Sequence, residues 1–126
     1  MKKTSPMKKL TEREDQIMQL VWQTEPVFIR DIVDQLPDPK PHYNSVATIV
    51  KILVKKGFLT SVKMGNTDQY SAKIKMETYR QVEVKAMQKK YFGNSLPKMM
   101  AHFAKQEDLS DQDIQELIAL IKSKKS

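Results

Sequence analysis

The chain has 126 residues, of which 40% are hydrophobic and 29% are charged, and its formal net charge at pH 7 is +7. This composition predicts one ordered domain, or one domain with an appendage, and the basic charge favours a nucleic acid or an anionic membrane surface over acidic small molecules as the partner. The absence of cysteine excludes disulfide bonds and thiolate metal sites.

The first residues, MKKTSPMKKL, have the basic character of the start of a signal peptide, but no apolar segment follows them. The longest apolar run, Leu117 to Ile121, is too short to span a bilayer. We therefore expect a cytoplasmic protein that does not insert into a membrane.

Two helices are predicted before residue 37. Thr11 and Glu14 have the spacing of a capping box, which satisfies the free amides at a helix start, and Glu25-Pro26 ends the helix. Its buried face is formed by Ile17, Met18, Leu20, Val21 and Trp22. The second helix is short, and its apolar residues recur at helical spacing: Ile29, Ile32, Val33 and Leu36. Three prolines then exclude a helix until residue 42: Pro37, Pro39 and Pro41.

A third helix is predicted from Asn44 to Lys56, with Gly57 as its C-terminal cap. One face is apolar and consists of Val46, Ile49, Val50 and Leu53. At about 100° per residue, the opposite face carries Asn44, Thr48, Lys51 and Lys55. The helix therefore presents an apolar stripe to a core and a polar, cationic stripe to a partner outside the core.

A β-hairpin is predicted next. Val62 and Met64 alternate with polar residues, and Tyr70, Ala72 and Ile74 alternate on the return, with Gly65-Asn66 between them as a type II′ turn. Three helices followed by a two-stranded wing is the order of a winged helix-turn-helix domain. We assign it residues 1–75 of a mainly α protein.

Residues 76–126 are predicted to form three short helices with narrow apolar stripes. Such helices cannot enclose a sizeable core alone, so we interpret this region as a dimerisation region, whose stripes pack against a second copy. Packing of the stripes back on the first domain stays open as the alternative. The expected interface residues are Tyr79, Val82, Met87, Tyr91, Leu96, Met99, Met100, Phe103, Ile114, Leu117, Ile118 and Ile121.

The stretch from Pro39 to Thr67 contains five lysines and no acidic residue, which indicates a surface for a polyanion. Side chains at the start of the third helix would approach base edges, and the lysines would meet phosphates. The candidate DNA-binding residues are Lys40, His42, Tyr43, Asn44, Ser45, Ala47, Thr48, Lys51, Lys55 and Lys63.

Catalysis and metal binding have little support. The sequence has no nucleophile motif, no glycine-rich phosphate loop and no carboxylate pair in an apolar setting. His42 and His102 are not near other residues at metal-ligand spacing. We expect neither an enzyme activity nor a metal or other cofactor.

Two segments, LTEREDQIMQLVW and SVATIVKILVKKGFLTSVKMGNTDQYSA, together resemble the BlaI/MecI-type penicillinase repressor family of bacteria. The later stretch MAHFAKQEDLSDQDIQEL is similar to the dimerisation segment of that family, so the resemblance covers nearly the whole chain. The residues that carry it in the first two segments are Leu10, Thr11, Glu14, Ile17, Met18, Trp22, Thr48, Leu53, Lys56, Gly57 and Tyr70.

The resemblance implies a dimeric repressor on a palindromic operator, usually ahead of β-lactamase, sensor-protease or related genes, and hence a role in antibiotic resistance. It also implies derepression when a membrane-bound sensor metalloprotease cleaves the C-terminal region, at a bond that falls on His102-Phe103. His102 stands where the family has Asn, and Ala47 stands where it has Arg, whereas the neighbouring Thr48 is kept. A winged-helix module that binds protein or RNA, with only non-specific nucleic-acid binding, is the alternative function.

Overall fold

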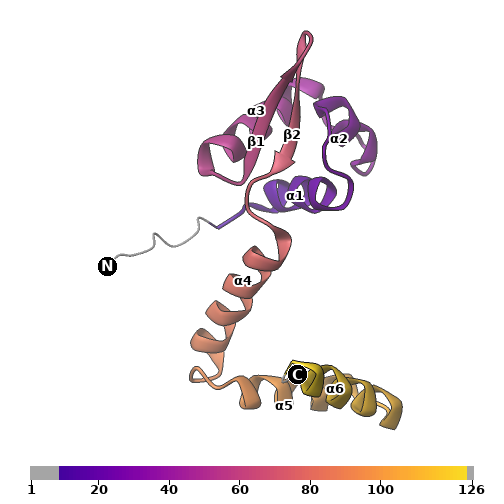
Figure 1. Ribbon diagram of the computed structural model, residues 1–126, viewed down its shortest axis with the longest axis vertical. Helices are drawn as coiled ribbons and strands as arrows, with labels where there is room; N and C mark the ends of the chain where they lie inside the picture. The colour runs from indigo at the N-terminus through magenta and orange to yellow at the C-terminus, as the bar shows by residue number, and fades with distance from the viewer. Residues whose placement is uncertain (1–8, 125–126) are drawn as a thin grey trace. The chain divides into compact units, whose positions relative to one another are not determined.

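The computed structural model describes residues 9–124, which form two compact units that divide between Val82 and Glu83. Eight elements follow one another along the chain (Figure 1). They are α1 (Glu12–Thr24), α2 (Ile29–Gln35), α3 (Tyr43–Lys56), β1 (Leu59–Met64), β2 (Thr67–Ala72), α4 (Met76–Tyr91), α5 (Leu96–Glu107) and α6 (Asp111–Ser123). The prediction of a mainly helical chain with one small hairpin is confirmed.

The first unit is a winged helix-turn-helix domain. Helices α1, α2 and α3 pack against one another, and the antiparallel β1–β2 hairpin follows them as the wing (Figure 1). Val27, between α1 and α2, pairs with Tyr70 of β2 through two backbone hydrogen bonds of 2.9 and 2.7 Å. The base of the wing is thereby fixed to the helical part of the domain.

Two glycines set the ends of α3 and of the first wing strand. Gly57 has a φ of +88° and closes α3, where its amide and that of Phe58 donate to Val54 and Leu53. Gly65 has a φ of +66°, whereas Asn66 stays outside the left-handed region, and the two residues join Met64 to Thr67. These are the features of the predicted type II′ turn.

The core of the first unit is continuous and apolar. On α3 it includes Val46, Val50 and Leu53, which are fully buried, while Ile49 is half-buried beside them. The complete cluster of buried residues is Leu10, Ile17, Met18, Val21, Val27, Ile29, Ile32, Leu36, Val46, Val50, Leu53, Phe58, Leu59 and Tyr70. The helical faces predicted from the apolar spacing are thus the buried faces.

Tyr79, which the sequence analysis placed in the dimer interface, is half-buried and packs against this core. Its ring centroid lies 5.8 Å from that of Trp22 and 5.5 Å from that of Phe58. Trp22 also donates its indole N–H to the Ile74 carbonyl at 2.9 Å. The start of α4 is therefore part of the first unit, which extends to Val82 and not only to residue 75.

The second unit contains the end of α4 and helices α5 and α6. Gly93 and Asn94, with φ of +56° and +63°, separate α4 from α5. A complete capping box, in which Ser110 and Asp113 each bind the backbone of the other, begins α6. Within the described residues, only Met99 of this unit is buried. No helix in the described range 9–124 is both long enough and apolar enough to cross a membrane.

A buried carboxylate joins the start of α1 to the end of α3. Glu14 is only 4% exposed, and its carboxylate accepts from Lys56 Nζ at 2.8 and 2.9 Å and from the Thr11 amide at 2.8 Å. Burial alone raises the pKa of Glu14, but the hydrogen bond and charge of Lys56 and the hydrogen bonds from Thr11 outweigh it, so the net pKa is lowered. The ionised form of Glu14 therefore stabilises the fold.

We expect Glu14→Gln to lower the free energy of unfolding at pH 7 by about 1–3 kcal/mol, because glutamine keeps the capping box but loses the ion pair. The stabilisation by ionised Glu14 is present above the unfolded glutamate pKa of about 4.3 and is lost as the pH falls through the lowered folded value. Urea unfolding curves of the wild type and variant should therefore converge in acid. Glu12→Gln, at an exposed site in the same turn, is the control. An equal gap at neutral and acidic pH would contradict this role.

Candidate DNA-binding surface

The outer face of α3 is exposed along its length. Asn44, Thr48, Lys51 and Lys55 are all exposed, on the side opposite the buried residues. The Thr48 hydroxyl donates to the Asn44 carbonyl at 3.0 Å. Because its proton is used in this bond, the Thr48 hydroxyl oxygen can accept a hydrogen bond from an amino group on a base edge, such as adenine N6 or cytosine N4.

Two of the five lysines in the acid-free stretch are bonded inside the domain. Lys56 pairs with Glu14. Lys40 donates to the carbonyls of Asp34 and Leu36, both at 2.8 Å, where it satisfies acceptors at the C-terminal end of α2. The structure thus gives Lys40, whose side chain stays 44% exposed, a role in holding the α2–α3 connection. The exposed lysines of this stretch, which lies within the described residues, that make no such bond are Lys51, Lys55 and Lys63.

The start of α3 is formed by residues of different exposure. His42 is the N-cap residue, and its exposed side chain makes no capping hydrogen bond. Tyr43 is 40% exposed. Ser45 is exposed as predicted, but Ala47 is half-buried against the core. Ala47 is therefore less accessible to a base edge than Ser45 is.

The wing is less basic than the sequence suggested. Lys63 lies directly across the hairpin from Asp68, one residue beyond the acid-free stretch, so the two charges offset each other near the tip. The other face of β1 carries Val62 and Met64, which are 58% and 46% exposed. Burial, followed by the nearby Asp68 and Tyr43, raises the pKa of Tyr70 at the base of the wing.

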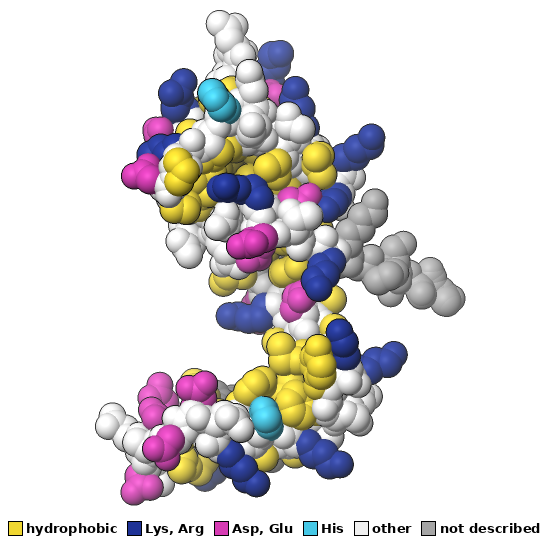
Figure 2. Space-filling view, turned by 180° about the vertical axis from the view of Figure 1, so that it is seen from behind, with side chains coloured by type: hydrophobic (Ala, Val, Ile, Leu, Met, Phe, Trp, Pro, Cys, Tyr) yellow, Lys and Arg dark blue, Asp and Glu magenta, His cyan; other side chains and the backbone are white. Residues whose placement is uncertain are grey.

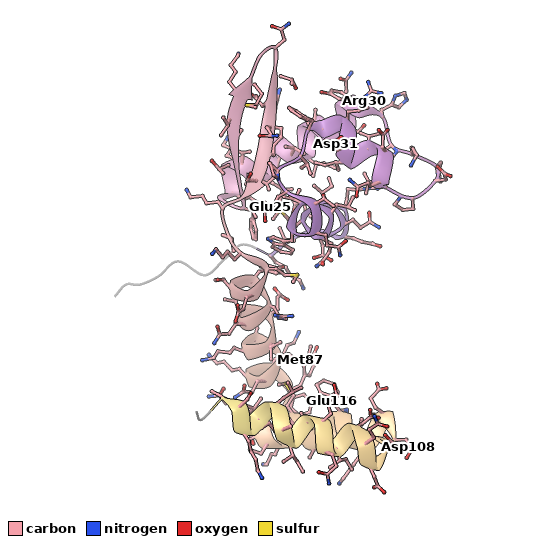
Figure 3. The ribbon with its side chains drawn as sticks, turned by 45° about the vertical axis from the view of Figure 1, so that its right-hand side comes forward. Glu25, Arg30, Asp31, Met87, Asp108 and Glu116 are labelled. Carbon is pink, nitrogen blue, oxygen red and sulfur yellow. The ribbon has the colours of Figure 1, made fainter. Side chains whose placement is uncertain are left out.

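Two residues of this surface were missed by the sequence analysis. Ile52 is 41% exposed on α3, and the helical period that found Thr48 and Lys55 also places Ile52 near them. Arg30 lies on α2, and its guanidinium carbon is 5.6 Å from the ring centroid of Tyr43 (Figure 3). No sequence pattern links Arg30 to α3, because that contact exists only after the helices pack.

The second unit exposes a large amount of apolar surface. Figure 2 shows the hydrophobic side chains gathered on it. The exposed ones are Val84, Met87, Tyr91, Leu96, Phe103, Ile114, Ile118, Leu120 and Ile121. An apolar hollow of about 230 Å³ lies between α5 and α6 and is lined by Met100, Phe103, Ala104, Glu107, Leu109 and Leu117. Most of the predicted interface residues are thus open to a partner; the exceptions are Met99, which is buried, and Tyr79, Met100 and Leu117, which are half-buried.

The bond between His102 and Phe103 lies inside α5. The sequence analysis expected a candidate scissile bond here. The His102 ring packs 5.4 Å from Phe92 and 5.6 Å from Phe103, centroid to centroid. The ring cluster and the helical backbone would both have to open before a protease could bind this bond in an extended form.

Metal binding has no support among the residues that the structure describes. No group of three or more histidine, aspartate or glutamate side chains in that part of the chain is arranged to hold an ion.

Comparison with protein families gives a match to the penicillinase repressor model over residues 10–123. The chain belongs to the penicillinase repressor family. Its members are transcriptional repressors and not enzymes, in agreement with the absence of catalytic motifs.

Curated relatives agree with this assignment. A penicillinase repressor of Staphylococcus aureus is 26% identical over 102 residues, which cover 80% of this chain and 81% of the relative. That of Bacillus licheniformis is 23% identical and covers 95% and 97% of the two chains. The methicillin resistance regulatory protein MecI of S. aureus strain N315 is 22% identical and covers 91% and 94%.

Solved structures of other regulators align more loosely. The multiple antibiotic-resistance repressor MarR of Listeria monocytogenes aligns with a TM-score of 0.49 at 17% identity, covering 92% of this chain and 72% of that chain. ZitR of Lactococcus lactis gives 0.47 at 14%, covering 100% and 82%. The winged-helix assignment rests on the element order and the hairpin register described above.

We expect Lys40→Gln to lower the free energy of unfolding by about 0.5–1 kcal/mol, because two carbonyls at the end of α2 lose their donor. The salt dependence of DNA binding should stay at the wild-type value. Lys51→Gln is the matched control: it should reduce the slope of log K against log salt by about 0.9 and leave stability nearly unchanged. An equal reduction of the salt slope in the two variants would show that Lys40 contacts DNA as Lys51 does.

Proposed function

We propose that this protein is a homodimeric transcriptional repressor that binds a palindromic operator in double-stranded DNA through α3. The observation that carries the proposal is the exposed, acid-free face of α3, which combines polar side chains with cations. Membership of the penicillinase repressor family supports the same conclusion.

In this proposal α3 enters the major groove and the contacts divide by chemistry. Asn44, Ser45 and Thr48 lie toward the start of the helix and read base edges. Lys51 and Lys55 neutralise phosphates, which fixes the register without reading the sequence. The wing, with Lys63, contacts the flanking backbone or minor groove.

The C-terminal helices provide the dimer contact. Their exposed apolar residues are too many for a small unit that buries only one side chain of its own among those described. A two-fold dimer would cover this surface and place two α3 helices at half-sites one helical turn, or a multiple of it, apart.

Derepression by cleavage in the C-terminal region completes the proposal. A membrane-bound sensor metalloprotease would cut at His102-Phe103 and separate the end of α5 and all of α6, which carry part of the dimer contact, from the DNA-binding unit. Only the family resemblance supports this step. Incubation of the repressor with membranes that contain such a protease, followed by mass spectrometry of the fragments, tests it directly.

The test of the function as a whole is a fluorescence-anisotropy titration at two salt concentrations. The probes are a duplex selected from a random library for its affinity to the protein and a shuffled duplex of the same composition. We expect the selected duplex to bind about 10³-fold tighter or more. Equal affinities that both vanish with added salt would instead favour a winged-helix module that binds protein or RNA.

Thr48→Ala should weaken binding to the selected duplex more than binding to the shuffled one, because a base contact is lost. Lys55→Ala should weaken both alike and reduce the salt slope by about 0.9. The same titrations measure both effects. An equal loss of specificity in the two variants would contradict the division between base and phosphate contacts.

Ile118→Asp should convert the dimer into a monomer, because it places a charge in the apolar face of α6 without disturbing a buried side chain. Sedimentation equilibrium measures the mass of each variant. Gln112→Asp adds the same charge on the opposite side of α6 and should remain dimeric. A dimeric Ile118→Asp variant would show that α6 is not in the interface.

A further inference from the structure

Arg30 is an exposed cation held beside the start of α3. It is the second residue of α2, and its guanidinium carbon lies 5.6 Å from the ring centroid of Tyr43, the first residue of α3. An arginine over an aromatic face is attracted by the ring electrons, and the contact restricts the long side chain. The packing of α2 on α3 thus brings a cation to the end of the helix that we propose enters the groove.

The charge of Arg30 is not neutralised by the acidic residue next to it. The carboxylate of Asp31 accepts from the Phe28 amide at 2.9 Å, where it completes the capping of α2 (Figure 3). Between residues 9 and 124, the ion pairs are Lys40–Asp38 and Lys56–Glu14, and neither involves Arg30. The first turn of α3 carries no acid either.

We propose that Arg30, held against Tyr43, contacts a DNA phosphate and fixes the position at which α3 enters the groove. This inference rests on the proposed function and adds a contact outside the stretch identified from the sequence. A guanidinium group presents a planar pair of donors that fits a phosphate, and stacking lowers the entropy lost when the contact forms. Arg30 lies on the helix that precedes α3, the helix that crosses the DNA backbone in helix-turn-helix proteins, so it meets a phosphate and not a base.

The test uses the full-length protein with the selected and shuffled duplexes in anisotropy titrations over a range of salt. Arg30→Gln should lower the affinity for both duplexes about tenfold and reduce the salt slope by about 0.9. Arg80→Gln, which removes the same charge from the exposed surface of α4, is the matched control and should keep the wild-type slope. A wild-type slope for Arg30→Gln would overturn the phosphate contact.

The role of Tyr43 is tested by a double-mutant cycle. Tyr43→Phe keeps the ring over which Arg30 packs, so adding Arg30→Gln to it should lower the affinity by the same factor as in the wild type. Tyr43→Leu removes the ring and should lower affinity when Arg30 is present but change little in the Arg30→Gln protein. Equal effects of Tyr43→Leu in the two backgrounds would overturn the coupling. Arg30→Lys keeps the charge, so the salt slope should stay at the wild-type value while the affinity for both duplexes falls between those of the wild type and Arg30→Gln. Wild-type affinity in Arg30→Lys would show that the planar group and its stacking play no part.

Two controls separate this inference from the function on which it rests. Urea unfolding and sedimentation establish that each variant is folded and has the wild-type mass. If the wild-type protein itself fails to distinguish the selected from the shuffled duplex, the proposed function fails. If the wild type distinguishes them and Arg30→Gln binds with the wild-type affinity and slope, only the inference about Arg30 fails.

Discussion

The position of α3 depends on the buried ion pair between Glu14 and Lys56. A carboxylate at this depth is costly unless charged and polar groups compensate it, and here the compensation comes from Lys56 and the Thr11 amide. Because Thr11 begins α1 and Lys56 ends α3, the pair fixes the end of one helix against the start of the other. Gly57 follows directly and turns the chain into the wing.

The other end of α3 is held by contacts of a different kind. Lys40 bonds two carbonyls at the end of α2 and so shapes the proline-rich connection into α3. Arg30 packs over Tyr43 at the first turn. Cations from one short part of the chain thus divide into two groups: Lys40 and Lys56 are bonded within the domain and hold it together, while Lys51 and Lys55 lie on its outer face without such bonds among the described residues. A count of lysines overstates the charge available to DNA, since it does not distinguish these groups.

The second unit differs from the first in how little of its apolar surface it buries. It buries Met99 but leaves most of the apolar side chains of α5 and α6 exposed, so its helices gain little from packing within one chain. A second copy of the chain is the partner that we propose for this surface. The link between the dimer and DNA binding would then be geometric, because the spacing of two α3 helices depends on how these apolar faces meet.

The sequence by itself determined the elements of the winged-helix unit and their buried faces. Helical spacing identified Val46, Val50 and Leu53 as core, the capping box placed the start of α1 at Thr11, and Gly65-Asn66 specified the turn of the wing. These features depend on local backbone preferences and on period, which are encoded within a few residues. The same helical period also identified the exposed face of α3.

Only the tertiary structure decided which charged and aromatic side chains are already bonded. The pairing of Lys56 with Glu14 and the position of Arg30 over Tyr43 join residues that are distant along the chain. The packing of Tyr79 against the core likewise depends on where Trp22 and Phe58 come together. Such contacts arise from the packing of whole helices, and a local pattern in the sequence carries no information about which partner a side chain will meet.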